Sequence, residues 1–364
     1  MKKFLLFLSV AVLCACSSSV DDVQVYTLSV DKNVIEADGK DKAVFTITDA
    51  EGNVITTEDN MGRIYFKNVS TGFSLPRRSI SFSSIANGEY EFSGSFRNIQ
   101  TKNTVKIKAQ NRKKYELYHR NIGLFKCTSV WCSACPGLSD MLYELHSKDM
   151  ESKEHSVILS CHGKFDGKQD IFAINTGSTD LGNAMIAKYG GSGWPTLIYD
   201  MEKSETGVPL SASELSEKVM ARRLEHPATC GIKIISSSVD GNAIKVTASM
   251  KTSAAGSYDL TAALVKDNLY YDGGYSVGGQ GIFDDVLIAI QSNFMMYSNE
   301  TGKSMNAGEE MTRTFTFDFG ANLPALTDLE VVAFAHRKTT NGRTVMDNII
   351  SVPFGQTSEY ILND

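Results

Sequence analysis

The sequence Val130-Trp131-Cys132-Ser133-Ala134-Cys135-Pro136 decides the interpretation of this chain. Its two cysteines are separated by two residues, with an aromatic residue before the first and a proline after the second. Residues 121–127 form a run typical of a strand, and residues 136–148 have the spacing of an amphipathic helix. A thiolate at the first cysteine would therefore lie at a helix N-terminus, where free amide groups and the helix dipole favour negative charge.

The wider segment 113–227 alternates between strand and helix patterns. Further strands are predicted at 156–161 and 196–199, and further helices at 181–189 and at 212–224, the last opened by a capping box at Ser211. The order β-α-β-α-β-β-α is that of the thioredoxin fold. We therefore predict a central thioredoxin-like α/β domain over residues 113–227.

A second short motif, Gly193-Trp194-Pro195-Thr196, precedes one of these strands. In thioredoxin-like proteins a proline at this point is cis and faces the two cysteines, and an X-Pro bond adopts the cis form at small cost. The chain has two tryptophans, and each lies in one of the two motifs. We predict that Trp131, Trp194, Pro195 and Thr196 bind an extended substrate beside a Cys132–Cys135 disulfide.

The predicted chemistry is thiol–disulfide exchange. Cys132 is expected near the surface as the attacking thiolate, with a pKa lowered to about 3.5–7.5 by such an environment, and Cys135 as the buried resolving thiol. Exchange passes through a mixed disulfide. Lys126 lies six residues before Cys132, where many thioredoxin-like domains carry a carboxylate that assists proton transfer. We expect Lys126 to turn to solvent; the alternative is that it points inward and favours the thiolate. In either case the site lacks the carboxylate that would assist proton transfer, so efficient catalysis is in doubt.

Two alternatives compete with a redox site. Cys132 and Cys135 with Cys161 or His162 would make a plausible zinc ligand set, although the strand–motif–helix context and Pro195 argue against it. No metal or other cofactor is therefore predicted. The second alternative is a static structural disulfide without turnover. His162 itself is interpreted as a loop or core histidine.

The remaining cysteines of the predicted folded part are Cys127, Cys161 and Cys230. Cys127 and Cys161 are expected on neighbouring strands as buried free thiols, with a disulfide between them as the alternative. Five cysteines with one close pair do not suggest a disulfide scaffold. A composition of 42% hydrophobic and 21% charged residues excludes general disorder, and a net charge of −6 argues against a nucleic-acid binder.

Residues 1–15 have the pattern of a secretory signal, with Lys2 and Lys3 before an apolar run that is too short to span a membrane. The run ends in Leu13-Cys14-Ala15-Cys16, which resembles a bacterial lipobox. This resemblance implies acylation of Cys16, a polar tether over residues 16–23 and a lipid anchor in the outer membrane of a diderm bacterium, on its periplasmic or cell-surface side. Loss of Lys2 and Lys3 would leave the mature chain at −8.

Residues 24–112 show short β-rich segments separated by turn signals, among them Asn87-Gly88, which suits a type I′ hairpin. The sequences 28–32 and 35–39 resemble bacterial immunoglobulin-like repeats of adhesins, so we predict an immunoglobulin-like β-sandwich. It would serve as a spacer above the membrane or as an adhesive module. Residues 228–364 predict a C-terminal β-sandwich domain with a Gly-rich loop at 273–281 and a short helix at 283–291.

With Phe125, the Trp-Cys-x-x-Cys-Pro motif, His162 and residues 193–196 in place, residues 115–355 resemble the outer-membrane-protein-28 lipoproteins of diderm anaerobes. These proteins place a thioredoxin-like domain before a β-rich C-terminal domain. The segment 331–334 also resembles a strand of that family, whereas Cys127 and Ser129 replace its usual phenylalanine and glycine. The resemblance implies compartment and architecture more than activity.

The sequence therefore predicts a multidomain α+β protein with three domains. Its expected function is that of an outer-membrane-anchored lipoprotein which exchanges disulfides with extracytoplasmic protein thiols or disulfides. The alternative is a surface binding or adhesin-type lipoprotein whose thioredoxin-like domain is a non-catalytic scaffold and whose partner is a surface ligand.

Overall fold

The computed structural model describes residues 24–69, 74–84, 87–112, 118–176, 179–291, 302–338 and 344–363. The protein is multidomain and mainly β-structure, with 48% of its residues in strands and 15% in helices. Residues 1–23, which carry the predicted signal peptide, the tether and Cys16, lie outside the described part. None of the described helices is long and apolar enough to cross a membrane.

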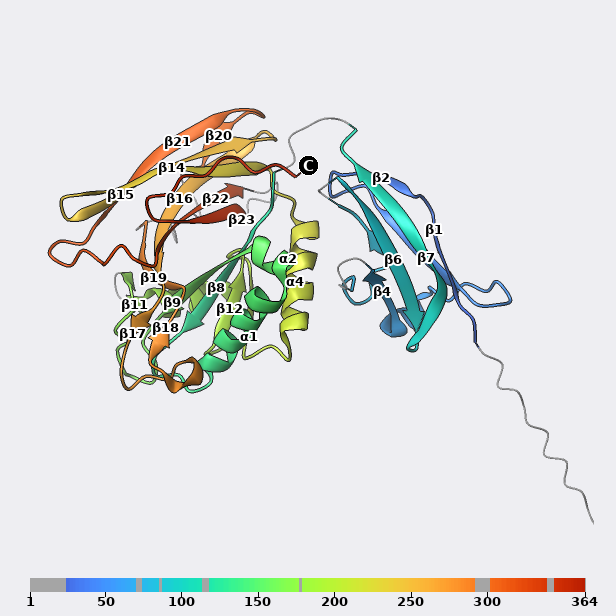
Figure 1. The fold of residues 1–364 in the computed structure, drawn as a ribbon, viewed down its shortest axis with the longest axis horizontal. Helices are drawn as coiled ribbons and strands as arrows, with labels where there is room; N and C mark the ends of the chain where they lie inside the picture. The colour runs from blue at the N-terminus through green and yellow to red at the C-terminus, as the bar shows by residue number, and fades with distance from the viewer. Residues whose placement is uncertain are drawn as a thin grey trace, which may run out of the picture.

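Residues 24–112 form a two-sheet sandwich, which is blue to cyan in Figure 1. One sheet has the strand order β1-β3-β5 and the other β2-β7-β6-β4. Inward-facing aromatic rings fill the space between the sheets; Phe45 stacks on Phe66 with ring centroids 4.7 Å apart. The elements are β1 (Thr27–Val30), β2 (Val34–Glu36), β3 (Ala43–Thr48), η1 (Glu58–Arg63), β4 (Ile64–Asn68), β5 (Ser81–Phe82), β6 (Gly88–Phe96) and β7 (Ile99–Gln110).

The tight hairpin of this sandwich lies at Arg97-Asn98, between β6 and β7. Both residues have positive φ values, 49° and 68°, as a type I′ turn requires. The predicted turn at Asn87-Gly88 is wrong, because Gly88 is the first residue of β6. Arginine is an unusual first residue for such a turn, and the sequence pattern therefore pointed elsewhere.

The central unit contains the predicted strands and helices in the predicted order. Its strands run β13-β12-β8-β9, with β8 parallel to β9 and antiparallel to β12. The elements are β8 (Ile122–Thr128), α1 (Cys135–Lys148), α2 (Met150–Glu154), β9 (Ser156–His162), β10 (Asn175–Thr176), β11 (Thr179–Asp180), α3 (Leu181–Tyr189), β12 (Thr196–Tyr199), β13 (Lys203–Thr206) and α4 (Ala212–Glu225).

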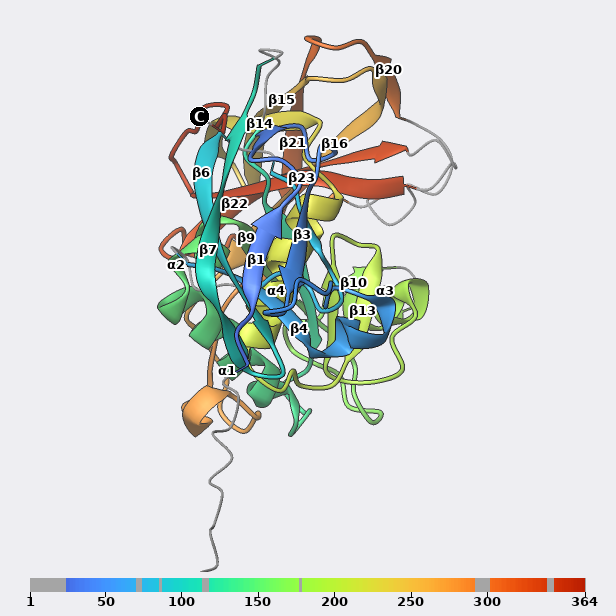
Figure 2. The same ribbon diagram turned by 90° about the vertical axis from the view of Figure 1, so that its right-hand side faces the viewer.

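Both faces of β8 are buried, which explains why its sequence is mainly apolar apart from Lys126 and Thr128. Ile122 and Leu124 pack with residues of α1 and α4, whereas Phe125 and Cys127 belong to the core on the α3 face. Figures 1 and 2 place α4 on the side of the central unit that faces the N-terminal sandwich. Because successive side chains of a strand alternate, Lys126 is on the α1 face.

The central sheet does not end at β9. The strand β19 (Val286–Ile290) adds in parallel through Val286 and Ser160, and the sheet continues through β16, β22 and β23. The predicted helix at 283–291 is therefore wrong. The predicted separation of 113–227 from 228–364 is also wrong for this sheet, which crosses that boundary and makes the two segments one structural unit.

A second, three-stranded sheet, β14-β15-β21, packs on one face of β16 and β22. The other face of β16 and β22 joins the core that contains α3. The C-terminal sandwich thus shares one of its two sheets with the central unit (Figure 1). The elements are β14 (Cys230–Asp240), β15 (Ala243–Thr252), β16 (Gly256–Lys266), β17 (Leu269–Tyr270), η2 (Val277–Gly279), β18 (Ile282–Phe283), β20 (Lys303–Met305), β21 (Glu310–Asp318), β22 (Leu329–Lys338) and β23 (Thr344–Pro353).

A buried carboxylate ties the start of β8 to α4. Asp200 accepts hydrogen bonds from the amide of Gly123 at 2.9 Å, from Arg120 Nη2 at 2.7 Å and from Arg222 Nε at 3.0 Å. Arg120 and Asp200 are both fully buried. Arg120 Nη2 also donates to the carbonyl of Met346 in β23, at 3.4 Å. Loss of this charge would leave two guanidinium groups without their shared partner.

We expect Asp200→Asn to lower the free energy of unfolding by about 3 kcal/mol, because breaking a buried ion pair leaves an uncompensated charge. Asparagine tolerates the positive φ of 50° at this position. Denaturant unfolding followed by tryptophan fluorescence measures the change, since both tryptophans lie in the central unit. The matched control is Asp166→Asn, at an exposed residue with a φ of 47°, which should change stability by less than about 0.5 kcal/mol. Equal free energies of unfolding for the two variants would contradict the role of Asp200 as the buried partner of Arg120 and Arg222.

Candidate functional site

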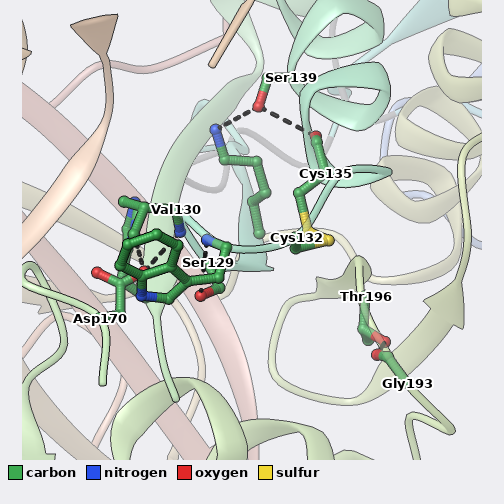
Figure 3. Close-up of a disulfide and its surroundings, with 11 residues drawn as sticks. Ser129, Val130, Cys132, Cys135, Ser139, Asp170, Gly193 and Thr196 are labelled. Atoms are coloured by element: carbon green, nitrogen blue, oxygen red, sulfur yellow. Dashed lines mark hydrogen bonds and ion pairs between the residues drawn. A yellow bond between two sulfur atoms is a disulfide. The ribbon is translucent and has the colours of Figure 1, made fainter. Parts of the chain in front are cut away.

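The two cysteines of the motif form a disulfide at the start of α1, as predicted. β8 ends at Thr128, a short turn carries residues 129–134, and α1 begins at Cys135 with Pro136 in its first turn. Proline suits this place because the first amides of a helix have no intrahelical acceptor. Figure 3 shows the disulfide between this helix and the loop that carries Gly193 and Thr196.

Both sulfur-bearing residues are buried: Cys132 exposes 1% of its surface and Cys135 exposes 2%. The expectation that Cys132 lies near the surface is therefore wrong for the disulfide state. A thiolate of another protein reaches Cys132 Sγ only if neighbouring groups move. This burial is the main constraint on any chemistry at the site.

The turn before Cys132 is fixed by a buried carboxylate. Asp170 accepts a 2.7 Å hydrogen bond from the amide of Val130 and lies 3.0 Å from Nδ1 of His162. Burial alone would raise the pKa of Asp170, but hydrogen bonds from His162 and from the amides of Val130 and Phe172 lower it. Burial lowers the pKa of His162, with Asp170 opposing. His162 is thus a core histidine, as interpreted from the sequence, and it orients the motif through Asp170.

Trp131 is half-buried and lies against two other segments. Its Nε1 donates to the carbonyl of Gln169 at 2.9 Å, and the ammonium of Lys168 lies 5.0 Å from its ring. Its ring also meets Tyr271 edge-on, with ring centroids 5.8 Å apart. Trp131 therefore connects the motif to a segment more than a hundred residues away.

That distant segment, residues 267–285, contains β17, η2 and β18, and we call it the cover segment. The amide of Tyr275 donates to the carbonyl of Val130 at 2.7 Å. A Cβ atom at Gly274 would lie 3.0 Å from the side chain of Val130, so glycine allows this close approach. The Gly-rich loop noted in the sequence thus packs on the residues that lead into the motif, a role that sequence spacing did not reveal.

The second motif has the expected cis bond between Trp194 and Pro195. The hydroxyl of Thr196 donates to the carbonyl of Gly193 at 2.6 Å, and Thr196 is fully buried. The Trp194 ring lies against Gly163 and Gly182, where an added Cβ would be 2.8 Å from it. Two of the predicted substrate-binding residues, Trp194 and Thr196, are therefore held in place by contacts within the chain itself, and these contacts do not test whether they bind a substrate.

Lys126 is buried, with 6% of its surface exposed, so the expectation that it turns to solvent is wrong. Its Nζ donates to Ser139 Oγ at 3.0 Å, and Ser139 Oγ in turn lies 3.4 Å from the carbonyl oxygen of Cys135 (Figure 3). Burial lowers the pKa of Lys126, while Asp285 and Asp284 oppose this effect. A cation thus lies below the first turn of α1.

The other three described cysteines are free and buried. Cys127 and Cys161 are register partners on β8 and β9, and no disulfide joins them. Burial raises the pKa of Cys161 to about 12 and the pKa values of Cys127 and Cys230 well above their ordinary range. These thiols therefore stay protonated and inert. Among the described residues, no group of three or more His, Cys, Asp or Glu side chains is placed to hold a metal ion.

No protein-family model matches the chain, and no curated protein matches it. Among solved structures, HBP35 of Porphyromonas gingivalis is similar over 65% of this chain and 76% of its own, with a TM-score of 0.51 and 18% identity. This likeness concerns the fold alone. A structure of catalytically inactive OgpA from Akkermansia muciniphila with an O-glycopeptide substrate covers 43% of this chain and 39% of its own at 12% identity, and its TM-score of 0.17 carries no argument.

Replacing Lys126 by Met removes a positive charge below the motif and keeps an unbranched side chain. Because a nearby cation favours a thiolate, we expect the thiol pKa of the reduced motif to rise by about one unit. The reduction potential should fall by about 30 mV, which corresponds to about 1.4 kcal/mol for two electrons. Redox titration against glutathione and thiolate absorbance measure both quantities. Lys148→Met, on the exposed end of α1, is the control; a potential that stays constant in both variants would contradict this role.

Proposed function

We propose that the central unit is a thioredoxin-like domain that exchanges disulfides with extracytoplasmic proteins. The observation that carries this proposal is the Cys132–Cys135 disulfide, which spans the turn between a buried central strand and a helix N-terminus. The strand order β13-β12-β8-β9 and the helices α1, α3 and α4 support it. The fold likeness to HBP35 is consistent with a related architecture.

In the reduced state, the Cys132 thiolate attacks one sulfur of a substrate disulfide. A mixed disulfide forms, and the other substrate sulfur leaves as a thiolate. The Cys135 thiolate then attacks Cys132 Sγ, which restores the internal disulfide and releases the second substrate thiolate. Two electrons pass from the dithiol to the substrate, and the released thiolates take up protons from water. The reverse sequence oxidises a substrate dithiol.

Cys132 is assigned as the attacking residue because it precedes α1, whereas Cys135 is the first residue of the helix. Its burial in the disulfide state means that exchange requires local opening. Trp131 and the cover segment, which contact the motif through Tyr271 and Tyr275, are the groups whose movement would expose it. Such opening of a loop costs less than unfolding of the core.

We also propose that the protein is a lipoprotein of the outer-membrane-protein-28 type, anchored through lipid on Cys16 in the outer membrane. The lipobox-like sequence, the Trp-Cys-x-x-Cys-Pro motif and the β-rich C-terminal part support this proposal. The N-terminal sandwich would then hold the central unit away from the membrane surface. As part of the same proposal, this sandwich is an immunoglobulin-like domain.

A second candidate function is that of a surface binding lipoprotein whose disulfide is structural. The near-complete burial of Cys132 and Cys135 favours this candidate, because a disulfide that no partner reaches has a static role. In that case the two β-rich parts would bind a surface ligand, and the central unit would be their scaffold.

Replacing Cys135 by Ala decides between the two functions. If the motif turns over, the variant expressed in its native host accumulates mixed disulfides through Cys132, because no resolving thiol remains. Non-reducing electrophoresis would then show a ladder that collapses on reduction. The control is Cys132→Ser/Cys135→Ser, which forms none. A clean single band from Cys135→Ala, together with failure of the reduced wild type to reduce insulin, would leave the scaffold function.

Replacing Cys16 by Ser tests the anchor. We expect the variant to lose palmitate labelling and to move from the membrane fraction to the soluble fraction, because the acyl chains supply stable membrane binding. Cys14→Ser is the matched control and should remain in the membrane fraction. Membrane association that survives Cys16→Ser would refute lipidation at this residue.

A further inference from the structure

A cavity of about 460 Å³ lies beside the disulfide motif, between α1, the β8–β9 floor and the cover segment. Its volume is within the usual range of ligand sites. Pro136 and His146 on α1 both line it, and at about 1.5 Å per residue they are about 15 Å apart along the helix. The cavity therefore extends from the first turn of α1 along most of that helix, and it matches about four to five extended residues.

The floor carries a cation with unused hydrogen-bonding capacity. Lys126 is more than nine-tenths buried and lines the cavity. Within the described residues its ammonium has one hydrogen-bond acceptor, Ser139 Oγ, although the group carries three donors. A buried donor without an acceptor costs free energy, so this floor favours a ligand that brings carbonyl oxygens.

Three carboxylates line the same cavity: Asp267, Asp284 and Asp285. Asp267 and Asp284 each accept one main-chain amide, from Asp285 and from Asn268. In the described part of the chain, the side chain of Asp285 accepts no hydrogen bond, and burial raises its pKa to about 7. Asp285, with a pKa of about 7, is only partly ionised near neutral pH, but the carboxylates still outnumber the single ammonium of Lys126 at this cavity, so a positively charged ligand group is the complementary one.

Apolar surface borders these charges. Tyr143 on α1 is 74% exposed, and Tyr275, Val277 and Ile282 of the cover segment are also exposed. All four residues line the cavity, where Leu142 and Phe283 add further apolar surface. Exposed aromatic side chains next to a pocket are common anchors for a polypeptide.

We propose that this cavity binds an extended polypeptide segment that carries a Lys or Arg side chain next to apolar residues. The basic side chain lies by Asp284 and Asp285, a main-chain carbonyl accepts a hydrogen bond from Lys126, and the apolar side chains contact Tyr143 and Ile282. This inference rests on the proposed exchange function in one respect: the bound segment would be the part of a substrate protein that brings its disulfide to the motif.

Isothermal titration calorimetry on the full chain in detergent, with the disulfide intact, tests the cavity directly. The probe is acetyl-Gly-Leu-Arg-Val-Gly-amide, and its matched partners carry citrulline or Glu in place of Arg. None contains cysteine, so binding is independent of exchange. We expect the Arg peptide to bind about tenfold more tightly than the citrulline peptide, because citrulline keeps the shape and loses the charge. The Glu peptide should bind most weakly.

Substitutions of residues that line the cavity test which of them cause the preference for the Arg peptide. Asp285→Asn and, separately, the exposed Asp284→Asn should each reduce the preference for Arg over citrulline about threefold or more. Lys126→Met should weaken the citrulline peptide and keep the preference for Arg. Glu359→Gln removes one exposed charge outside the cavity and should leave all affinities unchanged. Circular dichroism establishes that each variant is folded.

Equal affinities of the Arg and citrulline peptides, or tighter binding of the Glu peptide, would overturn the inference. An undiminished preference for Arg in both aspartate variants would also overturn it. The outcome is separate from that of the Cys135→Ala experiment. If the peptides bind but no mixed disulfides form, the cavity remains a docking site and the exchange function is removed. If mixed disulfides form but the peptides show no charge preference, the exchange function remains and the docking site is removed.

Discussion

The amide of Ser160 donates a 2.6 Å hydrogen bond to the carbonyl of Asp285, and the Ser160 hydroxyl donates to the carbonyl of Asp284 at 3.0 Å. These bonds satisfy the outer side of β9, which would otherwise carry unpaired polar groups in a buried sheet. The pairing brings β19 to the central sheet and sets the cover segment over α1. The enclosure of the motif, the burial of Lys126 and the neighbouring cavity all depend on it. The disulfide motif is therefore embedded in a larger unit and is not carried by an independent domain.

This embedding explains why both the disulfide and Lys126 are buried. Hydrogen bonds of Trp131, His162, Asp170 and Tyr275 hold the chain around the motif in place. The disulfide is buried, and the buried ammonium of Lys126 is linked through the Ser139 hydroxyl to the carbonyl of Cys135. Such a site suits slow, selective exchange with a partner that first engages the surrounding surface. It also suits a structural bridge, and the two functions differ only in whether the enclosure opens.

Local patterns predicted local structure well. Residues 181–189 and 196–199 have their predicted bounds, because the periodicity of a helix and the β-branched run of a buried strand are read from neighbouring residues. The disulfide was predictable from the close spacing of its two cysteines, whereas the cis bond before Pro195 was expected from the resemblance to thioredoxin-like proteins. The strand β19 was not, because its sequence also fits a helix and its partner in the central unit, β9, lies more than a hundred residues earlier. The burial of Lys126 was not predicted either, because alternation along β8 gives only the face of the sheet, and no sequence signal shows that Asp285 lies across from this lysine.

The end of the described chain returns to the start of the central unit: Tyr118 pairs with Leu362, and the amide of His119 donates to the carbonyl of Ile361. Every strand of the N-terminal sandwich lies before residue 113, so that part has all its contacts early in synthesis. The central sheet instead has to await β23 and residues 361–363. Until β19 has been made, the outer edge of β9 remains open, and an unpaired edge invites association with other chains. The central unit is therefore exposed to misassociation for longer during synthesis than the N-terminal sandwich is.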